Sequence, residues 1–461
     1  MTRSGFALLL LLVVLTRLPF LWSGYGTDPD AWRVADVATR LWHTGVYEPS
    51  RLPGNPLHEI LTAPLASLGD APISNAATLV CSLILLCVWH RIVQREARYP
   101  ALLVIVLAFT PLLWKNSAVT MDYLWSLLFI MLAFDAALRD RAVLAGIMAG
   151  LAAGFRPANA LAAAALMVPL LMGPRPLRAS VIFVLAAAGA AMLALMPLLA
   201  TLGLREWLTA SSAQLRNVRI TQDTGVLVAA YRAIYAIGPL AVLAIGWIVM
   251  RGWGSFRRPA LLRESAVATA VTMVFIYGAS FVLLPMEREY LLPALPFLLL
   301  LVDRLSTRRQ VVLTAAAIIS FAFINPDVVA HEGATGRIQA GIRPGMVIED
   351  LEKARIREEQ RALITGMHAA RPTIVLTGFP EPYWFADQDV IPLPSPLHEQ
   401  LYRNRTDTLL HHTFAISHPE LLATRARGFD VVVLRGAERF IQQTGGFSIA
   451  GEGLRVVPAA P

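Results

Sequence analysis

Long apolar stretches recur along the chain from Phe6 to Val329, separated by short polar connections. A helix needs about 20 predominantly apolar residues to cross a bilayer, and about eleven stretches reach or approach that length. They lie at about 5–23, 73–92, 100–114, 118–138, 142–155, 157–172, 179–203, 226–250, 266–284, 290–303 and 311–329, and 57–68 has the length of an interfacial or re-entrant helix. The pattern predicts a mainly α fold, a polytopic transmembrane helical bundle of about eleven spans.

The pattern changes after residue 329. Residues 330–461 mix polar and apolar positions and contain no spanning stretch. The runs Thr373–Thr377 and Asp430–Leu434 are typical of buried strands, and helical stretches such as 346–369 lie between or before them. About 130 residues suffice for one small α/β domain. We therefore divide the chain into a transmembrane domain, 1–329, and a C-terminal α/β domain, 330–461.

Composition and charge agree with a membrane protein. Hydrophobic residues make up 56% of the chain and charged residues 16%, whereas soluble domains carry about 25% charged residues. The formal net charge is +8. In a soluble protein this excess would suggest a nucleic-acid partner. Here arginine-rich cytoplasmic loops explain it, and we expect no nucleic acid.

The loop charges predict an orientation. With Arg3 in the cytoplasm and 5–23 as an uncleaved first span, the alternate connections are short and rich in arginine, as the positive-inside rule requires. They are His90–Arg98, Arg139–Arg141, Gly173–Arg178, Arg251–Arg263 and Asp303–Arg309. Residues 24–72 and the C-terminal domain then lie outside. We expect a multi-pass protein of a bacterial cytoplasmic (inner) membrane, with a periplasmic or extracellular C-terminal domain.

The first extracytoplasmic loop carries the strongest chemical signal. Asp28 and Pro29 form a good helix start, and Gly45 is a natural stop. Apolar residues recur between them at helical spacing, which predicts an amphipathic helix lying in the membrane surface. Taken singly, Asp28 is explained as a cap and Asp30 as a complement to the helix dipole. Their place at the membrane boundary, directly after a span, favours a functional role.

Other charged residues lie close to the bilayer. A Pro-rich stretch after the helix carries Arg51, His58 and Glu59. Asp122 is an acid within a predicted span, where it would pair with Lys115 or reach a cavity, and such an acid is a functional candidate. In contrast, Asp135 and Arg139 have the i,i+4 spacing of a surface ion pair.

On these residues the chain resembles the GT-C class of membrane glycosyltransferases, which includes protein O-mannosyltransferases and lipid A aminoarabinose transferases. Their first extracytoplasmic loop carries an Asp-Glu-x-Arg-Tyr-Ala motif on a helix parallel to the membrane. Asp30, Arg33 and Ala35 match its Asp, Arg and Ala. Ala31 replaces the second acid, and Asp28 supplies an acid on the other side. Looser matches are Gly54–Glu59, the Gly-rich span ending at Arg156-Pro157, and Glu287–Pro296, which is similar to an Arg-Tyr-x-x-Pro-x-x-Pro signature.

The resemblance implies transfer of a sugar from a polyprenyl-phosphate carrier to an extracytoplasmic acceptor hydroxyl. Such a transfer needs a carboxylate base and fixed cations at the leaving phosphate. We expect Asp30 to be the base, with Asp28 as second acid or substitute. For the phosphate we expect Arg288 first, then Arg156 and Arg51, although interfacial anchoring, or a simple turn at Arg156, explains each arginine equally well. The expected substrate-cavity residues are Arg33, His58, Glu59, Asp122 and Tyr290.

The expected partners are a polyprenyl-phosphate-linked sugar, a glycan, lipid or protein acceptor, and membrane lipid. The sequence decides neither hexosyl nor pentosyl transfer. We expect no cofactor. A divalent metal held by Asp28, Asp30 and Glu59 is conceivable but is not expected, because the closest relatives of the class manage without one.

Three alternatives remain open at this point. A polytopic lipid or glycan transporter or flippase would show paired inverted repeats and charges at the bilayer midplane. A membrane scaffold would tolerate neutralisation of Asp30. An O-antigen polymerase or ligase would carry its large functional loop late in the chain.

Overall fold

The computed structural model describes residues 1–221, 225–256, 263–330, 338–365, 367, 369–377, 390–392, 410–413 and 416–457. The chain forms two compact units. The first unit, which we call the helical unit, comprises Met1–Trp22 and Val37–Asp350. The second unit, which we call the mixed unit, comprises Ser23–Asp36 and Leu351–Pro461. The boundaries of 1–329 and 330–461 drawn from the sequence stay a prediction.

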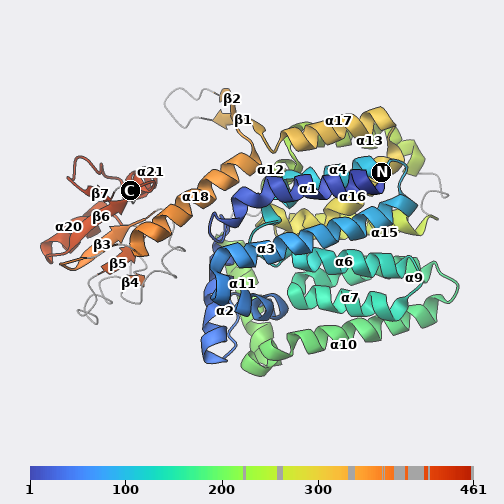
Figure 1. Cartoon of the computed structure of the whole chain (residues 1–461), viewed down its shortest axis with the longest axis horizontal. Coiled ribbons are helices and arrows are strands. Elements are labelled where there is room, and N and C mark those ends of the chain that lie inside the picture. Colours follow the sequence, from blue (N-terminus) through green and yellow to red (C-terminus); the bar gives the residue numbers. More distant parts are fainter. Residues whose placement is uncertain are drawn as a thin grey trace. The chain divides into compact units, whose positions relative to one another are not determined.

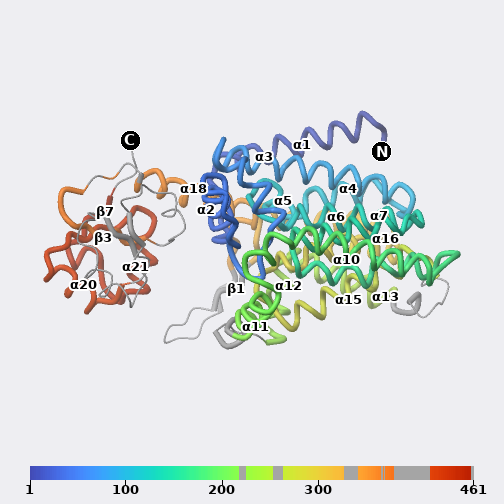
Figure 2. The backbone as a smooth tube through the Cα atoms, turned by 90° about the horizontal axis from the view of Figure 1, so that it is seen from below, coloured from blue at the N-terminus to red at the C-terminus, as the bar shows by residue number. Residues whose placement is uncertain are grey.

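The helical unit is built from apolar helices that pack side by side. Figure 1 shows α3, α6, α7 and α10 in that order, and each contacts the next. Figure 2 shows α1 at one side of this unit and α13 and α15 at the other. The elements are α1 (Arg3–Leu21), α3 (Pro56–Glu96), α4 (Pro100–Phe109), α5 (Pro111–Asn116), α6 (Tyr123–Ala137), α7 (Ala142–Phe155), η1 (Pro157–Leu161), α8 (Ala162–Leu166), α9 (Val168–Leu171), α10 (Pro176–Leu202), α11 (Leu204–Thr221), α12 (Val226–Ile237), α13 (Pro239–Phe256), α15 (Ser265–Leu283), η2 (Arg288–Ala294), α16 (Leu295–Leu305) and α17 (Arg308–Ser320).

Within the described residues, the helices α1, α3, α10 and α15 are each long and apolar enough to cross a membrane, and the bent pair α12–α13 makes a fifth. Shorter apolar helices include α4, α6 and α7. The predicted transmembrane helical bundle is therefore confirmed. The count of about eleven spans stays a prediction.

Several predicted spans are broken rather than straight. The stretch 226–250 bends by 100° between α12 and α13. Gly238 lies between the two helices with a φ of +94°, a left-handed backbone conformation that favours glycine, and Pro239 begins the next helix. The stretch 100–114 breaks at Thr110, whose backbone is extended, before Pro111 begins α5. The segment 57–68 is the first part of α3, which is interrupted by non-helical backbone at Gly69 and Asp70.

The last predicted span ends earlier than its apolar pattern. Helix α17 stops at Ser320, and strand β1 (Ile324–Ala330) pairs antiparallel with β2 (Ile338–Pro344). The prediction of a span reaching 329 is therefore wrong at its C-terminal end. Pro326 prevents a helix from continuing to 329, because proline lacks the N–H that a continuing helix needs.

Glycines allow α7 and α10 to touch backbone to backbone. A Cβ at Gly146 or Gly150 would lie 2.4 Å from the carbonyl oxygen of Phe183 or Ala187 in α10. The spacing of four residues puts both glycines on one face of α7. Membrane helices approach closely where small residues line such a face. This packing fixes the end of α7, and Arg156 follows directly.

The mixed unit contains a five-stranded parallel sheet in the order β4-β5-β3-β6-β7. Its elements are β3 (Thr373–Leu376), β4 (Val390–Pro392), β5 (Leu410–Thr413), α20 (His418–Ala426), β6 (Asp430–Leu434), α21 (Glu438–Gly445) and β7 (Arg455–Val457). The predicted strands at 373–377 and 430–434 are confirmed as β3 and β6, which are neighbours. Alternate residues of these strands, such as Ile374 and Val431, form the core with Leu421 of α20 and Ile441 of α21.

The helices α2 (Pro29–Thr44) and α18 (Met346–Thr365) contribute residues to both units. The predicted helix 346–369 is confirmed through Thr365. Helix α2 carries the candidate acids in its first turn, and α18 leads into the sheet.

We expect Gly150→Ala to destabilise the protein by about 1–3 kcal/mol, because the added methyl group overlaps an α10 carbonyl. The matched control is Gly189→Ala in α10, where no atom lies within 4 Å of the added Cβ. There the better helix propensity of alanine should leave stability equal or raise it by up to about 1 kcal/mol. Thermal unfolding in detergent micelles measures both. Equal unfolding midpoints for the two variants would contradict this account of the α7–α10 contact.

Candidate functional site

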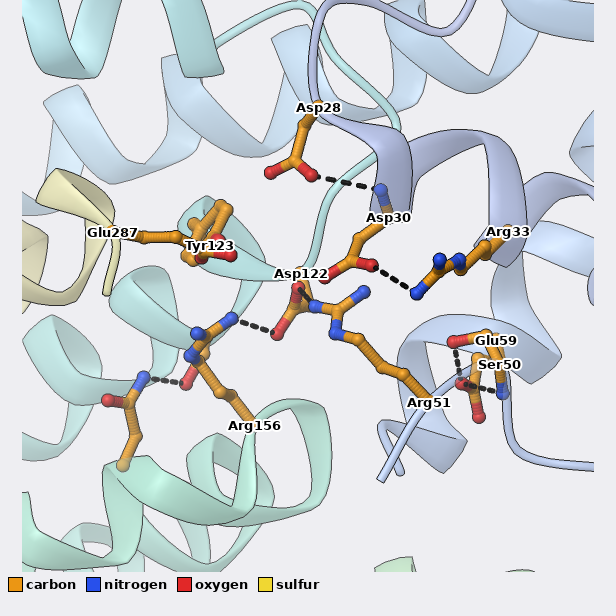
Figure 3. A network of polar contacts seen from close by, with 12 residues as sticks. Asp28, Asp30, Arg33, Ser50, Arg51, Glu59, Asp122, Tyr123, Arg156 and Glu287 are labelled. Carbon is orange, nitrogen blue, oxygen red and sulfur yellow. Dashed lines mark hydrogen bonds and ion pairs between the residues drawn. The ribbon is translucent and has the colours of Figure 1, made fainter. Parts of the chain in front are cut away.

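The two candidate acids of the first loop lie at the start of α2. The helix begins at Pro29, and Asp28 Oδ1 accepts a hydrogen bond of 2.9 Å from the backbone N–H of Asp30. The helix runs to Thr44 and Gly45 follows with a φ of +69°. The predicted helix with its cap and stop is therefore confirmed. Arg33 lies one turn on, 3.4 Å from Asp30 Oδ1 (Figure 3).

The turn before α2 is held by a buried tryptophan. The Trp32 indole N–H donates to the Gly26 carbonyl at 2.9 Å, and the ring packs edge-on against Tyr25. Both rings are buried. This turn has a backbone that favours glycine, since Gly24 and Gly26 have φ values of +67° and +99°. The direction in which the chain enters α2 is thus fixed by local contacts.

In the helical unit, one buried carboxylate binds two arginines. Asp122 lies in the loop before α6 and is fully buried. Its Oδ1 lies 2.9 Å from Arg51 Nη2, and its Oδ2 lies 2.8 Å from Arg156 Nη1. Figure 3 shows the carboxylate between the two guanidinium groups. The three charges sum to +1, so the cluster keeps an excess positive charge that can receive an anion.

The predicted partner of Asp122 is wrong. Lys115 does not pair with Asp122; its Nζ lies 2.5 Å from Glu289 Oε1 and 3.8 Å from Asp350 Oδ1. Lys115 belongs to α5, and the loop between α5 and α6 separates it from Asp122. Burial alone would raise the pKa of Glu289, but the Lys115 ammonium, a backbone hydrogen bond and the charge of Arg288 together outweigh burial and lower this pKa.

Aromatic rings and a second acid surround Arg156. Its guanidinium carbon lies 4.3 Å from the centre of the Tyr123 ring and 5.0 Å from that of Tyr290. The Tyr123 hydroxyl donates to Glu287 Oε2. Burial raises the pKa of Glu287, against the opposing effects of Arg156 and this hydrogen bond. Arg156 is therefore fixed in position and orientation by Asp122 and two tyrosines.

Arg288 lies outside this cluster. Its guanidinium carbon is 6.0 Å from the centre of the Tyr235 ring, and no ion pair joins it to Asp122 among the described contacts. The structure thus brings together Arg51 and Arg156 but not Arg288, the first choice from the sequence. The role of Arg288 stays a prediction.

Glu59 holds the Pro-rich loop in place. Its carboxylate is fully buried and accepts hydrogen bonds from the Tyr47 hydroxyl at 2.5 Å, the Ser50 N–H at 2.9 Å and the Ser50 hydroxyl at 2.5 Å. Burial and the Glu59 carboxylate raise the pKa of Tyr47, which therefore remains a donor. Since Arg51 follows Ser50 directly, Glu59 positions the segment that carries this arginine. His58 is also buried, with its ring 5.8 Å from that of Trp125.

Several residues of the site were not singled out from the sequence. Tyr123 and Glu287 flank Arg156. Asn159, three residues after Arg156, donates to the Ser126 hydroxyl at 2.6 Å and accepts from the Tyr277 hydroxyl at 2.9 Å. This chain of polar groups joins α6, η1 and α15. The sequence signal was weak: Glu287 opens the stretch Glu287–Pro296 but is not a position of its signature, whereas Ser126 and Tyr277 occur within apolar runs.

Two further points concern charged groups. The predicted pair of Asp135 and Arg139 is confirmed at 3.2 Å, but its place at the surface is wrong for Asp135, which is buried. Arg91 and Arg95 bind the same carboxylate at 2.6 Å each. In the part of the chain that the structure describes, no group of three or more His, Cys, Asp or Glu residues is arranged to hold a metal ion.

The chain is similar in structure to ArnT from Cupriavidus metallidurans, solved as a crystal structure with undecaprenyl phosphate bound. The TM-score is 0.53 at 13% sequence identity, and the match covers 89% of this chain and 90% of that one. The likeness shows that the two proteins share a fold, so the predicted GT-C-like fold is confirmed. No protein-family model and no curated protein sequence matches the chain.

We expect Asp122→Asn to destabilise the protein by about 3–5 kcal/mol, because it leaves two mostly buried guanidinium groups without their counter-charge. The control is Asp135→Asn. The arginines around Asp135 are a third to a half exposed, so water screens them and the loss should be about 1 kcal/mol. Thermal unfolding in detergent micelles compares the two. A loss at Asp122 no larger than at Asp135 would show that the cluster is not a structural constraint.

Proposed function

We propose that the protein is a membrane glycosyltransferase that moves a sugar from a polyprenyl-phosphate carrier to the hydroxyl of an extracytoplasmic acceptor. The fold carries this proposal: it is shared, over nearly the whole of both chains, with ArnT, whose crystal structure holds undecaprenyl phosphate. The charged cluster around Asp122 supports it, because an apolar helical unit keeps buried cations only where they are paired or bind a ligand.

Arg51 and Arg156 are the proposed ligands of the carrier phosphate. Each uses one guanidinium nitrogen on Asp122, and the remaining N–H groups of a guanidinium can donate to phosphate oxygens. The net charge of +1 stabilises the anion that forms when the bond from the anomeric carbon to the phosphate oxygen breaks. Arg288 is proposed as a further cation for the phosphate because of its place in the stretch Glu287–Pro296.

Asp30 is the proposed general base. Its register matches the motif of the GT-C class, and its carboxylate lies 3.4 Å from Arg33, whereas Asp28 accepts the Asp30 N–H as the cap of the helix. In the reaction the acceptor hydroxyl gives its proton to the Asp30 carboxylate while its oxygen bonds to the anomeric carbon. The polyprenyl phosphate leaves with the electron pair of the broken bond. Asp28 is proposed as a second acid or as a substitute for Asp30.

The proposed substrate-cavity residues are Arg33, His58, Glu59, Asp122 and Tyr290. We further propose that no metal or cofactor takes part.

The proposed location is a bacterial inner membrane with a cytoplasmic N-terminus and with the C-terminal domain outside. The transferred group is a hexose or a pentose, and the acceptor is a glycan, a lipid or a protein.

We expect Asp30→Asn to lower the rate of sugar transfer by at least about 100-fold, since a positioned general base contributes about 10²–10⁴-fold. Membranes containing the full chain are supplied with a panel of radiolabelled polyprenyl-phosphate sugars, and the label reaching acceptors is measured. Glu48→Gln, which removes an exposed carboxylate from the same loop, should keep the wild-type rate.

Unchanged transfer in Asp30→Asn would remove Asp30 as the base. Absence of transfer by the wild-type protein from every donor, with label crossing the membrane on its carrier, would favour a flippase instead.

We expect Arg51→Gln and Arg156→Gln each to weaken binding of undecaprenyl phosphate by about tenfold or more, because each removes a charge-assisted hydrogen bond worth about 1.5–3 kcal/mol. Binding is measured with the purified protein by the quenching of its tryptophan fluorescence, beside a thermal unfolding measurement of each variant. Arg139→Gln, at the Asp135 cluster, should not change the affinity. Variants that fold but bind with wild-type affinity would place the phosphate elsewhere.

A further inference from the structure

Helix α18 contacts the turn that leads to the candidate acids. Arg357 Nη1 donates to the carbonyl oxygen of Thr27, the residue directly before Asp28. The Arg357 side chain is buried, with 7% of the residue exposed. All three residues belong to the mixed unit. A residue 330 positions later in the chain thus binds the backbone of the first loop next to its first acid.

Neighbouring residues of α18 extend this contact. The Glu358 carboxylate lies 2.6 Å from where a Cβ on Gly24 would be, and the φ of +67° at Gly24 itself favours glycine. Arg361, one turn after Arg357, lies with its guanidinium carbon 6.0 Å from the centre of the Trp32 ring and pairs with Glu358 at 2.6 Å. One face of α18 therefore covers the turn Gly24–Thr27.

Another face of α18 is fixed to the parallel sheet. Gln360 is fully buried; its Oε1 accepts from the Thr377 hydroxyl at 3.3 Å, and its Nε2 donates to the Arg435 carbonyl at 3.4 Å. Thr377 and Arg435 follow the neighbouring strands β3 and β6. Leu363 and Ile364 join the apolar cluster on this side of the sheet. The helix is thus a rigid connection between the strand ends and the turn.

The turn is held by two donors on consecutive carbonyls. Trp32 binds the Gly26 oxygen and Arg357 binds the Thr27 oxygen. Fixing two successive peptide planes fixes the backbone dihedrals at the start of α2 and so the direction in which Asp28 and Asp30 point. A misplacement of about 1 Å in a catalytic group can cost about 100-fold in rate.

We propose that Arg357 is a positioning residue for the general base: through α18, the C-terminal sheet holds the turn Gly24–Thr27 and thereby orients Asp28 and Asp30. The role of Arg357 in sugar transfer rests on the proposed function. The contact by which Arg357 holds the turn does not depend on that function. Arg357 is not a phosphate ligand in this account, because its guanidinium is buried on a backbone carbonyl.

The first test measures the turn directly. Hydrogen–deuterium exchange of a peptide covering residues 23–33 is followed in the full chain in lipid nanodiscs. We expect at least fivefold faster exchange in Arg357→Gln than in the wild-type protein. Arg357→Lys should have an intermediate effect, because its ammonium can still donate to the carbonyl. Arg355→Gln should exchange at the wild-type rate. Arg355 is exposed on the same helix. Wild-type exchange in Arg357→Gln would overturn the proposal whatever the activity.

The second test measures transfer from a donor that the wild-type protein accepts. We expect Arg357→Gln to lower kcat about tenfold or more and to keep the KM for the donor within about twofold of the wild-type value. Arg357→Lys should recover part of the rate. Because Arg357 acts through the base, the double variant with Asp30→Asn should be no slower than Asp30→Asn alone. Arg355→Gln should keep the wild-type kcat.

The outcomes separate the two proposals. Faster exchange with an unchanged kcat, or additive losses in the double variant, would overturn the positioning role. If the wild-type protein transfers no sugar from any donor, the proposed function fails, and the exchange measurement alone then decides whether α18 holds the turn.

Discussion

A buried carboxylate in an apolar helical unit constrains the rest of the site. Asp122 has no exposed surface, and an ionised carboxylate without water is tolerated only when charges of opposite sign bind it closely. Arg51 and Arg156 meet this requirement from two other segments of the chain. The single carboxylate therefore ties the Pro-rich loop, the start of α6 and the end of α7 to one point.

The surrounding structure holds each arginine at that point. The glycine face of α7 packs against α10 and fixes where Arg156 emerges, and Tyr123 and Tyr290 then lie against its guanidinium. On the other side, Glu59 accepts three hydrogen bonds from Tyr47 and Ser50 and so fixes the loop that carries Arg51. The excess positive charge is thus preorganised, which is the property that a site for a leaving phosphate requires.

The parts of this arrangement that depend on local sequence could be predicted. Asp28, Pro29 and Gly45 predicted the limits of α2, because caps and stops act within a few residues. The strands β3 and β6 followed from short β-branched apolar runs. The pairing of Asp122 could not be predicted: its partner Arg51 lies 71 positions away, and Lys115, the basic residue close in sequence, points to Glu289 instead. Apolar pattern alone also gave no sign that α12 and α13 bend by 100°.

The division of the chain changes how the C-terminal part is understood. By its apolar pattern, the first loop belongs to the transmembrane region, yet Ser23–Asp36 forms a compact unit with Leu351–Pro461. The backbone of the turn Gly24–Thr27 binds Trp32 from its own loop and Arg357 from α18, while Gln360 of the same helix binds the ends of β3 and β6. The acids at the start of α2 are therefore part of the fold of the C-terminal unit. The C-terminal part of the chain, which looked separate in the sequence, thus supplies through Arg357 a contact that holds the turn before α2.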